Sequence, residues 1–119
     1  MSEESAERLR RAHQLFVEGY RLHMAGDLEA AIGRYRESIE SQPTAEAHTF
    51  LGWALSFLDR LDDAISECKK AIAVDPDFGN PYNDIGSYLL KQGKLDEAIP
   101  WLDRAVAAKR YEARHYPHC

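Results

Sequence analysis

The sequence predicts an all-α fold of three antiparallel helix pairs, on the evidence of an internal repeat and of apolar spacing. Three stretches read alike, GDLEAAIGRYRESIESQP from Gly26, DRLDDAISECKKAIAVDP from Asp59 and GKLDEAIPWLDRAVAAKR from Gly93, and they start 33 and 34 residues apart. Large apolar residues recur in them at the 3.6-residue spacing of a helix face. Sustained alternation of β-branched residues and Asn-Gly hairpins are missing, so strands are not expected.

The helices can be placed in order along the chain from their turn and stop signals. They are expected at about 9–24, 28–41, 45–58, 62–74, 79–91 and 95–109, with residues 2–8 extending the first. Gly26, Asp59 and Gly93 mark the tight turn inside each pair, because glycine and aspartate tolerate a left-handed backbone. Pro43 and Pro76 close the first two pairs, since proline cannot continue a helix interior.

The first helix of each pair carries a glycine at the same position. Glycine inside a helix costs about 1 kcal/mol relative to alanine. Its recurrence at Gly19, Gly52 and Gly86 therefore predicts that two helices cross closely there. Large apolar anchors at 3.6-residue spacing recur at matching positions of the second helices: Ile32, Ile65 and Ile99, with Ile39, Ile72 and Val106.

These positions together resemble the tetratricopeptide repeat, a helix–turn–helix unit of roughly 34 residues. In the second unit the family pattern falls on Leu51, Gly52, Leu55, Ala64, Cys68, Ala71 and Pro76. The resemblance implies a right-handed α-solenoid, a superhelix of antiparallel helix pairs. It divides the chain into a helical extension (1–11), repeats at 12–44, 45–78 and 79–112, and residues 113–119, which open a fourth repeat or form a tail.

The sequence also departs from the family pattern at three positions. His48 stands where the family usually has tryptophan, and Glu18 stands where it usually has leucine. Arg110 stands where the closing proline of the third repeat would be. His48 fills a packing position, so we expect a structural rather than a catalytic role for it.

The resemblance implies that the first helices line a concave face, with ligand contacts at positions outside the packing pattern. The candidates for a peptide-binding groove are His13, Phe16, Tyr20, Phe50, Trp53, Phe57, Asn80, Asn83, Asp84 and Ser87. Aromatic anchors supply a large buried area at low entropy cost, and Asn80 and Asn83 are suited to hydrogen-bond an extended peptide backbone. The alternative is that some of the aromatic rings only fill space between neighbouring helices.

One well-known subtype of the family binds chaperone tails through a carboxylate clamp of lysine, asparagine and arginine side chains. The matching positions here hold Phe16, Tyr20, Phe50, Asn80 and Asp84. A cation is missing from this set, and Asp84 has the wrong charge for a carboxylate ligand. We therefore expect a protein or peptide partner other than an acidic chaperone tail.

The last helix suggests a rival function, self-association through the C-terminal face. Trp101 occupies a position that holds Arg34 and Glu67 in the other repeats. A tryptophan there indicates that the helix covers something: the tail with Tyr116, a fourth repeat, or a second copy of the chain. A single exposed aromatic residue is the alternative.

Composition sets the remaining expectations. A formal net charge of −5 argues against nucleic acid or an anionic membrane as partner. The apolar runs are too short to span a bilayer, and with only two cysteines we expect a reducing, cytoplasmic location. Motifs such as a phosphate loop, a nucleophile elbow or HExxH are missing, so we expect neither an enzyme nor a cofactor. His115, His118 and Cys119 lack a fourth ligand for zinc, so we expect no metal site.

Overall fold

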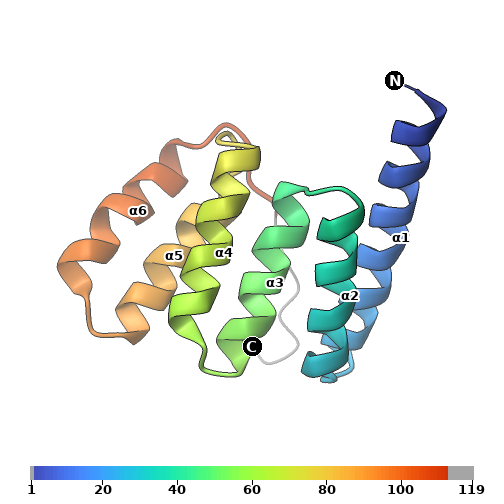
Figure 1. The fold of residues 1–119 in the computed structure, drawn as a ribbon. Helices are drawn as coiled ribbons and strands as arrows, with labels where there is room; N and C mark the ends of the chain where they lie inside the picture. The colour runs from blue at the N-terminus through green and yellow to red at the C-terminus, as the bar shows by residue number, and fades with distance from the viewer. Residues whose placement is uncertain (1, 113–119) are drawn as a thin grey trace.

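The computed structural model describes residues 2–112 of the chain, and in that range the secondary structure consists of six helices and their connections. The helices are α1 (Glu3–Met24), α2 (Leu28–Ser41), α3 (Ala45–Phe57), α4 (Leu61–Val74), α5 (Asn80–Lys91) and α6 (Leu95–Ala107). They form three antiparallel pairs that stand side by side (Figure 1). The helix ends lie within a residue or two of the expected positions, and α1 includes the predicted extension.

Side-chain caps and left-handed turns define the ends of the helices. Ser2, Asp27 and Thr44 each accept a hydrogen bond from a backbone N–H in the first turn of α1, α2 and α3. The turn inside each pair has a positive φ, at Gly26 (86°), Asp59 (58°) and Gly93 (76°). The prediction of left-handed turns at these three positions is therefore confirmed.

The two helices of each pair cross at the recurring glycine, as predicted. A Cβ atom added to Gly52 would lie 2.9 Å from the carbonyl oxygen of Ala64 on α4. The corresponding atom on Gly19 would meet the ring of Tyr35, and on Gly86 it would meet the side chain of Leu102. Each glycine therefore lets a second helix approach more closely than a side chain would allow.

The core lies between the two helices of each pair and between neighbouring pairs, and fewer side chains are buried in the C-terminal pair. Ile32 and Ile65 are buried as expected, but their equivalent Ile99 is 48% exposed and Val106 is 88% exposed. The apolar anchors of the third pair are therefore exposed at Ile99 and Val106. The reason is geometric: among the described residues no helix follows α6, so its outer face has nothing to pack against.

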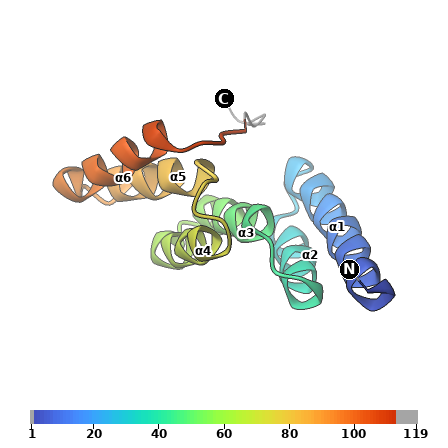
Figure 2. The same cartoon turned by 90° about the horizontal axis from the view of Figure 1, so that it is seen from above.

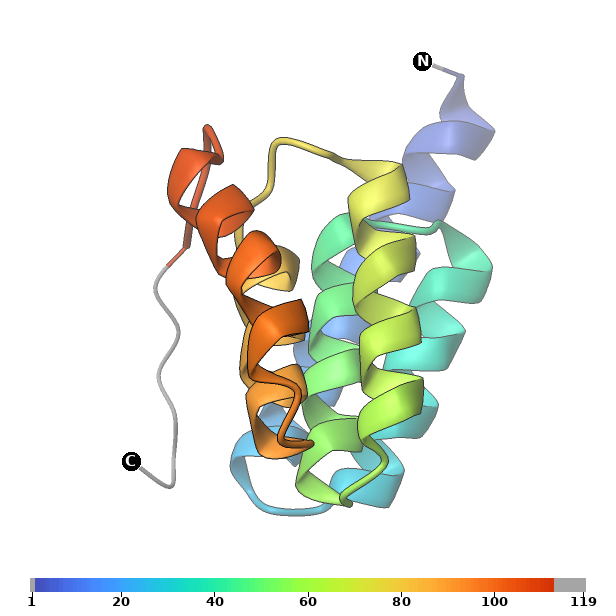
Figure 3. The same ribbon diagram turned by 90° about the vertical axis from the view of Figure 1, so that its left-hand side faces the viewer.

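The pairs fan around a curve, and α1, α3 and α5 lie on its inner side (Figure 2). The helix α3 contacts both α1 and α5, so the first helices form a continuous layer. After α6 the chain turns back and descends on the side of the molecule away from α4 (Figure 3). These last described residues, 108–112, are called the C-terminal segment below.

Candidate functional site

The inner side of α1 and α3 carries a chain of ring contacts. We call it the aromatic cluster, and its members are Phe16, Tyr20, His23, Phe50, Trp53 and Phe57. Phe16 and Phe50 meet edge to face with their centroids 5.1 Å apart, and Trp53 lies 4.3 Å from the imidazole of His23. Rings packed in this way fill the space between two helices and add favourable edge-to-face contacts.

Burial within this cluster corrects part of the predicted groove. Phe50 is 8% exposed and Trp53 is 3% exposed, so both rings belong to the core rather than standing free as anchors. The alternative interpretation, that aromatic residues fill space between neighbouring first helices, holds for these two. Phe57 at the end of α3 is 36% exposed and is the ring of the three that a partner can reach.

A pocket of about 240 Å³ lies between α3 and α5, and we call it the inner pocket. Its walls are Trp53, Ser56, Phe57, Asn83, Asp84, Ser87, Tyr88 and Lys91. The structure thus brings five of the predicted groove residues together in one concavity. Tyr88 was missed, because the repeat pattern places its neighbour Leu89 in the core and gives no signal for the ring beside it.

His13 and Phe16 lie elsewhere, in a second pocket of about 270 Å³ between α1 and the start of α3. Leu9, Ala12, Thr44 and Glu46 complete its lining. Tyr20 packs against Phe50 and lines neither pocket. The predicted groove residues therefore do not form one continuous pocket.

Asn80, at the start of α5, uses its side-chain amide within the chain, because the backbone that it binds belongs to the C-terminal segment and not to a partner peptide. Its side chain is 1% exposed. Its Nδ2 atom donates to the carbonyl oxygen of Glu112 at 2.7 Å, and its Oδ1 atom accepts from the N–H of Glu112 at 2.9 Å. A single amide thus satisfies both hydrogen-bonding groups of one residue of the C-terminal segment.

The same segment is joined to the α4–α5 connection by a parallel backbone bridge. The N–H of Gly79 donates to the carbonyl oxygen of Arg110 at 2.6 Å, and the N–H of Arg110 donates to the carbonyl oxygen of Asp77 at 3.0 Å. A Cβ atom on Gly79 would lie 2.9 Å from the Cβ of Ala108, so the missing side chain permits this approach.

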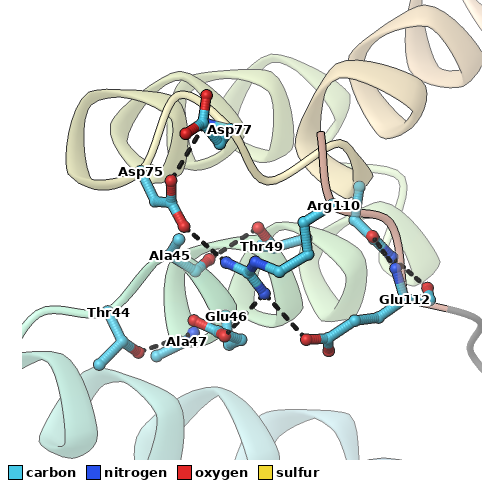
Figure 4. A network of polar contacts seen from close by, with 10 residues as sticks. Thr44, Ala45, Glu46, Ala47, Thr49, Asp75, Asp77, Arg110 and Glu112 are labelled. Atoms are coloured by element: carbon cyan, nitrogen blue, oxygen red, sulfur yellow. Dashed lines mark hydrogen bonds and ion pairs between the residues drawn. The ribbon is translucent and has the colours of Figure 1, made fainter. Parts of the chain in front are cut away.

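The guanidinium of Arg110 lies among three carboxylates (Figure 4). It donates to Asp75 at 2.5 Å, to Glu112 at 2.8 Å and, at a longer 3.4 Å, to Glu46. It also lies over the ring of Phe78, 4.3 Å from the centroid, where a cation is attracted to the aromatic face. We call Glu46, Asp75, Phe78 and Asn80 the arginine socket.

The charges in the socket affect each other's ionisation. The hydrogen bond from Arg110 lowers the pKa of Asp75 below its ordinary value, and the N–H of Asp77 adds to the effect. The hydrogen bond to Asp75 in turn raises the pKa of Arg110. The sequence offered one signal for this site, since Arg110 replaces the closing proline of the family pattern.

His48 has the structural role expected of it. Its Nδ1 atom is hydrogen-bonded to Glu67 on α4 at 2.9 Å, so it ties α3 to α4. Burial raises the pKa of Glu67, but the hydrogen bonds from His48 and Lys70 outweigh burial and leave that pKa below its ordinary value.

Trp101 packs against its own chain. Its ring lies 6.2 Å from that of Tyr82, and the guanidinium of Arg104 lies 4.8 Å from the ring centroids of both. Lys69 of α4 also approaches the Trp101 ring. Trp101 is thus half-buried against Tyr82 and Arg104, while self-association through it stays a prediction and Tyr116 lies outside the described residues.

Comparison with known proteins agrees with this geometry. The sequence pattern of the tetratricopeptide repeat matches residues 16–81 and again residues 58–113. The chain belongs to the tetratricopeptide repeat family. The small glutamine-rich tetratricopeptide repeat-containing protein 2 of Mycosarcoma maydis is 35% identical over 104 residues, which are 86% of this chain. They are only 29% of that relative, so the chain spans less than a third of its length.

Solved structures of tetratricopeptide repeats share the fold. The second repeat domain of Spaghetti (RPAP3), bound to the HSP90 peptide SRMEEVD, superposes with a TM-score of 0.84 at 20% identity and covers 91% of this chain and all of that one. The TPR2B domain of yeast Sti1, in its pHsp70 complex, has a TM-score of 0.78 at 28% identity, with 81% of this chain and 78% of that one covered.

Two further observations concern the described residues alone. Between residues 2 and 112, none of the helices has the length and apolar character that a membrane span requires. In the same range, His, Cys, Asp and Glu side chains do not gather in a group of three or more that could hold a metal ion.

Proposed function

We propose that this repeat chain is an interaction scaffold that binds a peptide segment of a partner protein at the inner pocket. The pocket itself is the observation that carries the proposal. Trp53 forms an apolar wall, Phe57 presents an accessible ring, and Asn83, Ser87 and Lys91 supply hydrogen-bonding groups beside it. An apolar concavity with a few polar groups suits a short peptide with one buried side chain.

The charge of the site supports a partner other than an acidic chaperone tail. Asp84 faces the inner pocket and would repel a terminal carboxylate, and Lys91 is the one cation among the described residues that line the pocket. We therefore expect no saturable binding of the peptide SRMEEVD at micromolar concentrations. A calorimetric titration that gives micromolar affinity for this peptide would contradict the proposal.

A displayed random-peptide library, selected on the immobilised full chain, tests the pocket directly. The affinities of the selected peptides are then measured for the wild type and for Phe57→Ala. We expect a loss of roughly tenfold, about 1.4 kcal/mol, because the accessible ring is the aromatic anchor of the pocket.

A matched control is Val74→Ala, which shortens a similarly exposed apolar side chain at the end of α4, away from the pocket. It should leave the peptide affinities unchanged. Equal affinities for the wild type and Phe57→Ala would show that the peptides bind elsewhere and would overturn the proposal.

A second candidate function is self-association through the outer face of α6. It is supported by three exposed apolar side chains on α6, those of Leu95, Ile99 and Val106. Light scattering across a range of concentrations tests it with Val106→Asp as the variant. Self-association through this face predicts a dimer that the variant abolishes, and a monomer at every concentration rejects it.

A further inference from the structure

The C-terminal segment occupies the arginine socket much as a peptide ligand would. It lies extended beside Asp77 and Gly79, and it exchanges two backbone hydrogen bonds with them. The side-chain amide of Asn80 forms hydrogen bonds with the backbone of Glu112, two residues after Arg110. An extended peptide of another chain presents the same groups, so the backbone contacts do not depend on the segment being part of this chain.

Side-chain recognition in the socket is specific for a guanidinium. Asp75 and Glu46 lie at the ends of two different helices, and their carboxylates accept hydrogen bonds from two nitrogens of Arg110. The ring of Phe78 packs against the guanidinium of Arg110. A planar fork with several donors can satisfy all three at once, whereas an ammonium cannot. Without a cation, two carboxylates would face one another across the socket.

The socket is also separate from the segment in sequence. Asp75 lies 35 residues before Arg110, and Glu46 lies 64 residues before it. Both carboxylates are about a third exposed, so an incoming side chain can reach them. The protein's formal net charge of −5 favours a basic partner over an acidic one.

We propose that the arginine socket is a binding site for an extended peptide segment that carries an arginine, and that the C-terminal segment is its resident ligand. The proposal rests on the proposed function, since it names a second contact for a peptide partner. The ligand is an arginine followed two residues later by a residue whose backbone pairs with Asn80.

A ligand from outside must compete with the tethered segment. A short tether gives its segment an effective concentration in the millimolar range. The wild type should therefore bind an external arginine peptide weakly, and a variant without the Arg110 side chain should bind it more tightly. The socket would then respond to partners only when they displace Arg110.

The test uses the full chain with Arg110→Ala and the capped peptide acetyl-AKRYE-amide, which copies residues 108–112. Titration is followed by NMR at the backbone amide of Gly79 and the side-chain amide of Asn80, because both contact the segment. We expect both signals to shift and saturate, with an affinity at least roughly tenfold higher for Arg110→Ala than for the wild type.

Two controls make the result specific. The peptide acetyl-AKAYE-amide should shift neither signal, and Asp75→Asn in the Arg110→Ala background should abolish the response to acetyl-AKRYE-amide. Absence of saturable shifts at Gly79 and Asn80, or equal shifts with the peptide that lacks arginine, would overturn the proposal. If Arg110→Ala does not fold, Arg110→Lys replaces it, with the same expected order of affinities.

The two proposals fail separately. Phe57→Ala leaves the socket intact, so it should not change the affinity for acetyl-AKRYE-amide. If library peptides bind at the inner pocket but the arginine peptide does not bind, the socket proposal fails and the proposed function stands. If the arginine peptide binds and no library peptide depends on Phe57, binding at the inner pocket is rejected and the socket proposal stands.

Discussion

At the α1–α3 end of the inner face, the aromatic cluster is packed ring against ring, whereas near the start of α5 the arginine socket holds its occupant by charge and hydrogen bonds. Both use positions that the repeat pattern leaves unassigned. Phe50 and Trp53 at such positions are buried by their neighbours, while Asn80 is buried by a different part of the chain.

The difference shows that, at a position outside the packing pattern, the chemistry of the side chain determines what covers it. Removing an apolar ring from water lowers the free energy, so the ring packs into the nearest space between helices. A buried side-chain amide needs hydrogen-bond partners for both its N–H donor and its oxygen acceptor, and here the backbone of the C-terminal segment supplies them. The predictions below test this contrast, beginning with the largest expected effect.

Trp53→Ala should destabilise the fold by about 3–5 kcal/mol, because it removes a fully buried ring and leaves a cavity in the aromatic cluster. Urea unfolding monitored by circular dichroism measures the loss. Trp101→Ala is the matched control, since its ring is only half-buried and should cost clearly less. Equal losses for the two variants would mean that the aromatic cluster contributes no more than a surface contact.

Asn80→Ala should destabilise the fold by about 1–3 kcal/mol, because Glu112 loses both hydrogen bonds to the side-chain amide. Thermal unfolding measures the change, and hydrogen exchange at the amide of Glu112 locates it. Asn83→Ala, a half-buried asparagine on the same helix, is the control and should change neither quantity much. Unchanged exchange at Glu112 would contradict the role assigned to Asn80.

Asp75 should make stability depend on pH in the acid range. Its folded pKa lies below the ordinary value of 3.8, so its ion pair stabilises the folded chain fully above that value. The contribution is lost as the pH falls through the folded pKa. The stability difference between the wild type and Asp75→Asn should therefore be constant near neutrality and vanish in acid.

The effect should be the smallest of the three, because the carboxylate is partly exposed and water screens its ion pair. Asp103→Asn, which changes an exposed carboxylate on α6, is the control and should show no such pH dependence. Added salt should reduce the Asp75 effect. A difference that persists unchanged in acid would mean that Asp75 acts through packing rather than charge.

Much of the fold could be predicted because its determinants are local. The left-handed turns follow from Gly26, Asp59 and Gly93, and the close helix crossing at Gly52 follows from a small residue repeated in register. The candidate site was only partly predictable. Repeat register names the positions that face inward, but it cannot tell whether a neighbouring helix covers them, as it covers Trp53.

The sequence by itself determined that this chain forms repeated helix pairs, since each signal lies within a unit of about 34 residues and acts through backbone geometry and helix periodicity. Only the tertiary structure decided which inward positions stay open and which are filled. Arg110 reaches Asp75 and Glu46 only after three repeats have stacked and the chain has turned back. Pairings across such distances depend on the assembled fold, because no local rule couples the residues involved.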